Sequence, residues 1–206
     1  MGSGIAQVAA QAGHEVLVID NSDEALKRSR NGIEKSLNKR VSSGRMTDNA
    51  RDGILGKISW ASELQHVASA QIVIEAIIED QQIKTDLIQK IDALVAPDAI
   101  IASNTSSFSI AELAMASKLP KRVFGLHFFN PVPAMKLIEV VPTQAADEKI
   151  TQALISLLQQ WGKVAVKVRD VPGFIVNRVA RPYYAEAFCA LGEGISPALI
   201  DHAFTA

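Results

Sequence analysis

The sequence predicts an α/β protein with a Rossmann-type, doubly wound, mostly parallel sheet, followed by the start of an all-helical domain. Short apolar runs typical of buried parallel strands alternate with helical patterns; these runs lie at 15–20, 71–76, 99–102 and 123–129. A helix of small residues at 2–12 leads into the first of these strands, as in a dinucleotide-binding βαβ unit. A Pro-Gly break at 172–173 precedes a long helical pattern, 174–191.

The opening of the chain matches only half of the dinucleotide-binding fingerprint. Of G-x-G-x-x-G, the last glycine is present as Gly2, and the strand and two glycines expected ahead of it are absent. Asp20 ends the following strand, close to the roughly twenty residues after the glycines where an acid binds the adenosine ribose. The alternative is that Asp20 is an ordinary strand-end or helix-cap aspartate. We therefore expect the fold to lack its first strand.

Length and composition limit the class of protein. The chain has 206 residues, 48% of them hydrophobic, and a net charge of −1, which is enough for one domain and part of another. The break in the pattern at 169–173 then divides the chain into a Rossmann-like domain over 1–169, which carries the dinucleotide-binding pattern, and the beginning of a helical domain over 170–206. The charge does not favour nucleic acid or a membrane surface as a partner, and no residue cluster suggests a metal. Without a secretory leader or an apolar run of eighteen residues, a cytoplasmic protein is expected. Cys189, in an apolar helical pattern, is expected to be a buried structural thiol.

The stretch 125–139, G-L-H-F-F-N-P-V-P-A-M-K-L-I-E, carries the strongest candidate for chemistry. His127 lies near the end of a buried strand, just before Pro131 and Pro133 force the chain to leave it. A second β-like run, 136–141, carries Glu139, and a tight turn between the two strands could set this carboxylate beside the imidazole. A histidine oriented by a carboxylate is the basic unit of general-base catalysis. The alternative is a core histidine with a surface glutamate nearby.

Polar residues follow two other predicted strands. Glu79 and Lys84 lie after the strand 71–76 and are expected on the ligand-side rim of the sheet, although plain surface charges would look the same. The strand 99–102 is followed by five small polar residues, 103–107, of which an N-cap explains only one. The long helix at 24–42 is basic, which is typical of a solvated face or of a landing surface for an anionic ligand.

Seven segments in one order resemble the 3-hydroxyacyl-CoA dehydrogenases, including the bacterial 3-hydroxybutyryl-CoA type. They are M-G-S-G-I-A at 1–6, V-L-V-I-D at 16–20, I-E-A-I-I-E at 74–79, S-N-T-S-S at 103–107, G-L-H-F-F-N-P-V-P at 125–133, K-L-I-E-V at 136–140 and P-G-F-I-V-N-R at 172–178. The resemblance implies interconversion of (S)-3-hydroxyacyl-CoA and 3-oxoacyl-CoA with NAD, as in fatty-acid β-oxidation or butanoate metabolism. It also implies a homodimer formed through the C-terminal helical domain when that domain is complete.

The same resemblance assigns roles to residues. His127 corresponds to the catalytic base and Glu139 to its orienting partner, while Ser106 and Asn177 correspond to contacts with the reacting oxygens. The cofactor contacts implied are Gly2, Asp20, Glu79, Lys84, Asn104, Ser106 and Asn130. Ser36 matches a position that touches coenzyme A, and Ser43 stands where many relatives have a lysine that reaches its phosphates. Two other functions stay open: a non-catalytic NAD-binding protein or remnant, and a β-hydroxyacid dehydrogenase that does not use coenzyme A.

Overall fold

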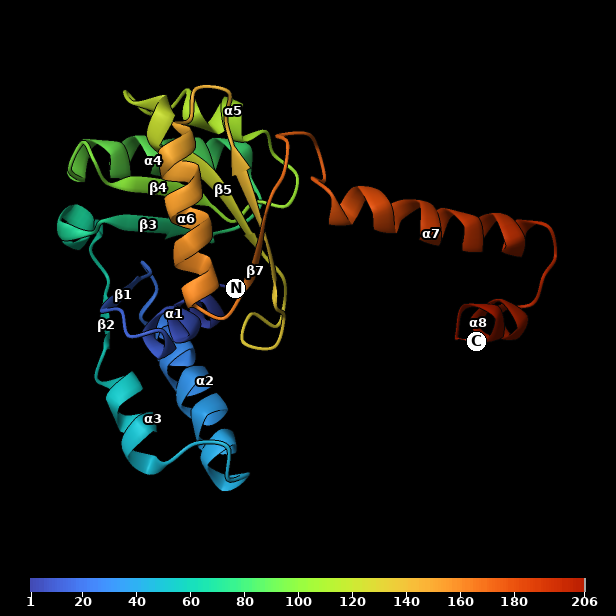
Figure 1. Ribbon diagram of the computed structural model, residues 1–206, viewed down its shortest axis with the longest axis horizontal. Coiled ribbons are helices and arrows are strands. Elements are labelled where there is room, and N and C mark those ends of the chain that lie inside the picture. The colour runs from blue at the N-terminus through green and yellow to red at the C-terminus, as the bar shows by residue number, and fades with distance from the viewer. Residues whose placement is uncertain (206) are drawn as a thin grey trace.

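Seven short strands form two sheets in the computed structural model, which describes residues 1–205 (Figure 1). β1 (Val16–Ile19) and β2 (Ile58–Ala61) form a parallel pair. The second sheet contains, in spatial order, β3 (Ile72–Glu75), β4 (Ile100–Ser103), β5 (Val123–Phe128), β6 (Leu137–Pro142) and β7 (Val164–Lys167). All pairs are parallel except β5 with β6. The predicted Rossmann-type, mostly parallel sheet is confirmed.

The strands of the described residues fall into two sheets that share no hydrogen-bonded ladder. In the described part of the chain, β1 pairs with β2 alone and β3 pairs with β4 alone. β1 and β3 therefore each have one edge without a ladder of backbone hydrogen bonds. The sequence analysis expected the first strand of the fold to be absent, and β1 indeed has a partner strand on one edge only.

Helices cover both faces of the five-stranded sheet (Figure 1). One face packs against α4 (Gln81–Leu94), α5 (Ile110–Ala114) and the 3₁₀ helix η1 (Leu64–Ser69), whose apolar side chains form one core with Ile101, Val123 and Val141. The other face packs against α1 (Gly2–Gln11) and α6 (Glu148–Gln160). The remaining elements are α2 (Asp23–Ser42), α3 (Asp48–Leu55) and a second 3₁₀ helix, η2 (Pro120–Arg122).

Helix α1 joins the two sheets. Its Ile5 and Val8 pack in the core of the five-stranded sheet, whereas Ala6 and Ala10 pack with α2 and β2. Small side chains allow this close approach to two neighbours at once. Gly13, with φ of +98°, ends the helix and turns the chain into β1, as a C′ glycine does.

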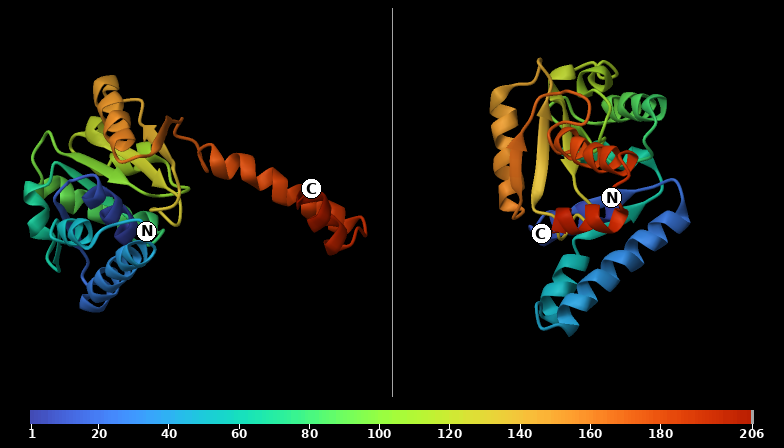
Figure 2. Two further views of the ribbon diagram at one scale, coloured as in Figure 1. Left: turned by 60° about the horizontal axis from the view of Figure 1, so that its bottom comes forward. Right: turned by 90° about the vertical axis from the view of Figure 1, so that its right-hand side faces the viewer.

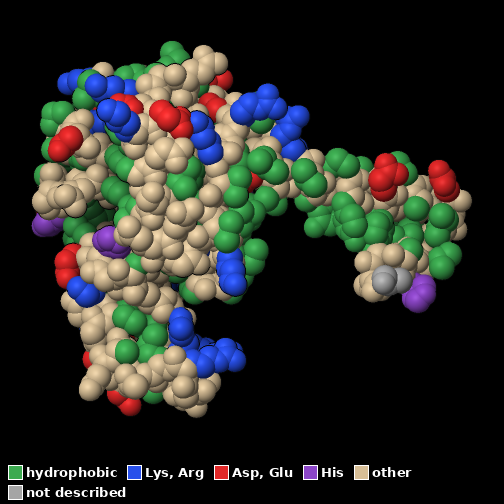
Figure 3. Space-filling view, in the orientation of Figure 1, with side chains coloured by type: hydrophobic (Ala, Val, Ile, Leu, Met, Phe, Trp, Pro, Cys, Tyr) green, Lys and Arg blue, Asp and Glu red, His purple; other side chains and the backbone are tan. Residues whose placement is uncertain are grey.

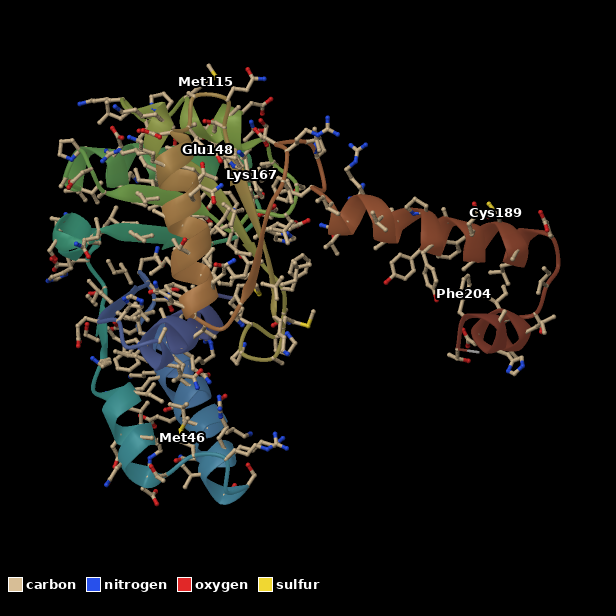
Figure 4. All side chains as sticks on the ribbon, viewed as in Figure 1. Met46, Met115, Glu148, Lys167, Cys189 and Phe204 are labelled. Carbon is tan, nitrogen blue, oxygen red and sulfur yellow. The ribbon has the colours of Figure 1, made fainter. Side chains whose placement is uncertain are left out.

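Helices α7 (Val176–Gly192) and α8 (Pro197–Thr205) extend as an arm away from the α/β body (Figures 1 and 2). Apolar side chains are exposed along the arm (Figure 3), with Val179 at 70% and Phe188 at 72% of their accessible surface. Cys189 lies on this arm and is exposed (Figure 4), so the expectation of a buried thiol is wrong. The helical pattern around Cys189 is apolar, but among residues 1–205 no element covers that side of α7. None of the helices in 1–205 is both long and apolar enough to span a bilayer.

Candidate active site

His127 and Glu139 form a buried pair on two neighbouring strands. β5 and β6 run antiparallel, and their register places His127 directly opposite Glu139. The Nδ1 atom of His127 lies 2.7 Å from Oε2 of Glu139. The histidine is 7% exposed and the glutamate 1% exposed. The structure thus brings together the two residues that the sequence analysis singled out.

This geometry sets the protonation pattern of the imidazole. A carboxylate accepts hydrogen bonds, so Nδ1 carries the proton that His127 donates to Glu139. The proton acceptor of the neutral ring is then Nε2, at the opposite corner. The rings of Phe129 and Phe174 flank the imidazole, with centroids at 4.5 Å and 5.6 Å. A neutral, oriented histidine with an available Nε2 is equipped to take a proton from an alcohol.

Ser106 and Asn177 meet at the start of the arm. The Nδ2 atom of Asn177 lies 3.5 Å from the carbonyl oxygen of Ser106, a long hydrogen bond. Asn177 is the second residue of α7 and Ser106 belongs to the loop after β4. The contact brings the loop after β4 against the first turn of α7, where this helix leaves the α/β body.

Glu79 organises the polar loop that follows β4. One of its carboxylate oxygens, Oε1, accepts hydrogen bonds from the hydroxyls of Thr105 and Ser107 and from the N–H of Ser106. Burial works to raise the pKa of Glu79, but the Thr105 hydroxyl, the Ser106 N–H and the Lys84 ammonium outweigh it and hold that pKa below its ordinary value of 4.5. The loop is therefore built around an ionised carboxylate at neutral pH.

Lys84 lies beside Glu79, as expected, but it is buried and not exposed at the rim. Its ammonium lies 2.6 Å from Glu75 and 3.3 Å from Glu79, and the residue is 1% exposed. Glu75 also accepts a hydrogen bond from the hydroxyl of Ser103. The ammonium therefore lies between the buried Glu75 and the exposed Glu79, so Lys84 contacts Glu79 but presents no exposed charge at the rim. The sequence signal for Glu75 was an acid inside the apolar run Q-I-V-I-E-A, which demands a buried partner.

The Glu79→Gln variant should be less stable than wild type at neutral pH, and the difference should shrink in acid. A group whose pKa is lowered on folding stabilises the fold above its unfolded-state pKa, and this contribution is lost as the pH falls through the folded-state pKa. The midpoint of urea unfolding, measured from pH 7 to pH 3, checks this. Glu63→Gln is the control, because Glu63 is exposed. A stability difference that stays constant below pH 4.5 would contradict the role given to the ionised Glu79.

Two of the other predicted residues line a cavity of about 250 Å³ between α1, α2 and the loop after β5. They are Ser36, on α2, and Asn130, in the loop. Asn104 does not line this cavity; its Oδ1 accepts the N–H of Phe128, 2.9 Å away, and ties β4 to β5. The structure thus brings Ser36 and Asn130 together, whereas Asn104 has a partner within the sheet.

The residues near the start of α1 fit a dinucleotide. Gly2 is the first residue of α1, which has no acidic side chain in its first turn and no side-chain cap, so its first N–H groups can meet a pyrophosphate. At the end of β1, one carboxylate oxygen of Asp20 accepts the N–H of Ser22 at 2.9 Å. Its second oxygen has no hydrogen-bond partner in residues 1–205, which suits a ribose hydroxyl.

Comparison with known proteins identifies the family. Residues 1–171 match the model of the 3-hydroxyacyl-CoA dehydrogenase NAD-binding domain, and residues 173–206 match that of the C-terminal domain of the same family. The chain is 45% identical over 204 residues to the 3-hydroxyadipyl-CoA dehydrogenase of Escherichia coli K12, covering 98% of this chain and 43% of that protein. It is 43% identical to a probable 3-hydroxybutyryl-CoA dehydrogenase of Deinococcus radiodurans, covering 98% of this chain and 72% of that protein.

Solved structures agree with the sequence comparison. The crystal structure of a 3-hydroxybutyryl-CoA dehydrogenase from Escherichia coli K12 superposes with a TM-score of 0.93 at 44% identity. The superposition covers 95% of this chain and 42% of that one, so the chain spans less than half of some relatives and about 70% of others. Together, the two family models account for nearly every residue of the sequence. The chain belongs to the 3-hydroxyacyl-CoA dehydrogenase family.

Proposed function

We propose that the protein is an NAD-dependent oxidoreductase that interconverts (S)-3-hydroxyacyl-CoA and 3-oxoacyl-CoA. The observation that carries the proposal is the buried His127–Glu139 pair, with Nδ1 of the histidine 2.7 Å from the carboxylate. The pair lies on the sheet of an NAD-binding domain of this family, which spans residues 1–171. The candidate base, His127, therefore lies within the same domain that would bind the cofactor.

The residues of the chain then take the following roles. When bound, NAD accepts the hydride from C3 of the substrate. Nε2 of His127 takes the proton of the 3-hydroxyl group, and in the reverse direction returns it to the developing alkoxide. Glu139 holds the Nδ1–H tautomer and stabilises the imidazolium. Ser106 and Asn177 hold the substrate oxygens, so that the reacting carbon faces the cofactor.

Cofactor and coenzyme contacts complete the proposed site. Gly2 and the start of α1 hold the pyrophosphate, and Asp20 binds the adenosine ribose. Ser36 contacts coenzyme A, and its position in one cavity with Asn130 supports this assignment. The other contacts proposed are with the ribose and nicotinamide, and they come from Glu79, Asn104, Ser106 and Asn130. Lys84, which is buried, acts on the cofactor through Glu79.

The direct test is the oxidation of NADH by the whole protein with acetoacetyl-CoA and, separately, with the ethyl ester of acetoacetate. The proposal expects turnover of the coenzyme A thioester and a much lower kcat/KM for the ester. Equal kcat/KM for both substrates would favour a β-hydroxyacid dehydrogenase that does not use coenzyme A. NAD binding without turnover of either would favour a non-catalytic NAD-binding protein.

We also propose that the whole protein is a homodimer formed through its helical domain. The apolar side chains exposed along α7 and α8 support this, because an exposed apolar face of this extent marks a packing surface. Analytical ultracentrifugation of the whole protein tests the proposal, and a monomer at micromolar concentration would contradict it.

NAD should be preferred to NADP. The carboxylate of Asp20 would repel a 2′-phosphate, and the residues after it, Asn21 and Ser22, supply no cation. The ratio of kcat/KM for the two cofactors measures the preference. The Asp20→Asn variant is the matched control, because an amide oxygen can still accept the N–H of Ser22 while the charge is gone. Its preference for NAD should be smaller than that of wild type; a wild-type preference for NADP would count against the role of Asp20.

A further inference from the structure

The carboxylate of Glu139 joins two elements that are distant in the sequence. Oε2 accepts the Nδ1–H of His127, and Oε1 accepts two backbone N–H groups, those of Ile175 at 2.9 Å and Val176 at 3.0 Å. With Glu139 at 1% exposure, water cannot easily replace any of these donors. The two oxygens of one buried carboxylate thus face different partners, one catalytic and one structural.

The sequence before α7 directs these N–H groups at Glu139. Gly173 and Phe174 both have positive φ, +78° and +48°, which turns the chain back toward the sheet. The Phe174 side chain is 1% exposed and packs near His127, which anchors the turn. Ile175 is the N-cap residue of α7 and makes no side-chain cap of its own. Glu139, from β6, takes the place of the missing cap and also meets the positive end of a 17-residue helix.

We propose that the N–H groups of Ile175 and Val176 are positioning groups for the His127–Glu139 pair. They fix which carboxylate oxygen faces the imidazole, and they couple the tautomer of His127 to the position of the start of α7 against the sheet. The importance of this coupling for turnover rests on the proposed function, in which His127 is the base. The coupling itself is a property of the fold. The helical domain then influences the chemistry through two backbone hydrogen bonds as well as through Asn177.

In the Glu139→Gln variant, the hydrogen bonds at position 139 should reverse the tautomer of His127. Glutamine keeps the size of glutamate but has one acceptor oxygen and one donor NH₂. Two N–H donors, from Ile175 and Val176, require the oxygen on their side, because the opposite orientation sets NH₂ against N–H. The NH₂ group then faces Nδ1 of His127, which must become the acceptor. The ring proton moves to Nε2, and the histidine can no longer take a proton from the substrate.

The test reads the tautomer of His127 by NMR in the whole protein with ¹⁵N-labelled histidine. The resonances of His127 are assigned by their absence in His127→Gln. At a pH where the ring is neutral, wild type should show protonated Nδ1 and Glu139→Gln should show protonated Nε2. A Glu139→Gln protein that keeps the proton on Nδ1 would overturn the proposal and leave the general-base assignment intact.

Amide hydrogen exchange tests the other half of the coupling. The N–H groups of Ile175 and Val176 should exchange slowly in wild type, in Glu139→Gln and in His127→Gln, all of which keep an acceptor at position 139. In Glu139→Leu, which is similar in size but has no acceptor, exchange at both positions should be at least tenfold faster. Exchange of these amides in wild type at the rate of free backbone would overturn the proposal, even if the leucine variant failed to fold.

These measurements separate the inference from the proposed function. Neither the tautomer nor the exchange rates require substrate or cofactor. A tautomer reversal in Glu139→Gln combined with an inactive wild-type protein would support the coupling and reject the dehydrogenase assignment. An active wild type with the proton still on Nδ1 in Glu139→Gln would do the opposite.

Discussion

The His127→Gln variant of the whole protein should turn over acetoacetyl-CoA about 10²–10⁴ times more slowly than wild type, with nearly unchanged affinity for NAD. The loss follows from the geometry, since His127 carries the Nε2 atom that would accept the substrate proton. Glutamine has no group that is basic at neutral pH. The cofactor contacts proposed for Gly2 and Asp20 lie on other elements, so NAD binding should survive.

Steady-state kinetics and calorimetry with NAD measure the two parts of this prediction. His66→Gln is a suitable control, because His66 is exposed on η1, outside the proposed site. The His127→Gln fold should persist, since Glu139 keeps its hydrogen bonds from Ile175 and Val176. Wild-type turnover by His127→Gln would show that another group is the base.

The sequence predicts those parts of the site that depend on local pattern. A histidine near the end of an apolar run, two prolines and a second apolar run carrying an acid are enough to expect two paired strands with facing side chains. The observed register places His127 opposite Glu139, although the connection between the strands, residues 129–136, is longer than the tight turn expected. The positions of the strands can also be predicted from local sequence, because buried strands are recognisable as short apolar runs.

Contacts between distant segments could not be predicted in this way. The burial of Lys84 depends on its ion pair with the buried Glu75, on the preceding strand. The hydrogen bonds from Ile175 and Val176 to Glu139 involve backbone groups, which carry no signal in the sequence. The exposure of Cys189 depends on what covers α7, and a helical pattern alone does not reveal whether its apolar face has a neighbour.

A polypeptide consisting of residues 1–206 should bind NAD weakly or not at all, show negligible dehydrogenase activity and tend to associate. Within residues 1–205, β1 and β3 each pair along one edge only, so the other edge of each strand has no ladder of hydrogen bonds. Unpaired strand edges recruit strands from other chains, and the exposed apolar side chains of α7 and α8 add a second surface for association. The pyrophosphate would meet the start of α1, but without the backbone donors of a preceding glycine-rich turn.

Calorimetry with NAD and light scattering on this polypeptide test the prediction. A second variant with an N-terminal extension tests whether an added strand restores NAD binding. A short apolar strand followed by Gly-x-Gly, joined ahead of Met1, should pair with both β1 and β3 and strengthen NAD binding at least tenfold. The matched control is an extension of the same length and composition in scrambled order with a central proline, which cannot donate to the ladder. Micromolar NAD binding by a well-behaved monomer of residues 1–206 would contradict the prediction, because the gap between the sheets would then be no obstacle to the cofactor.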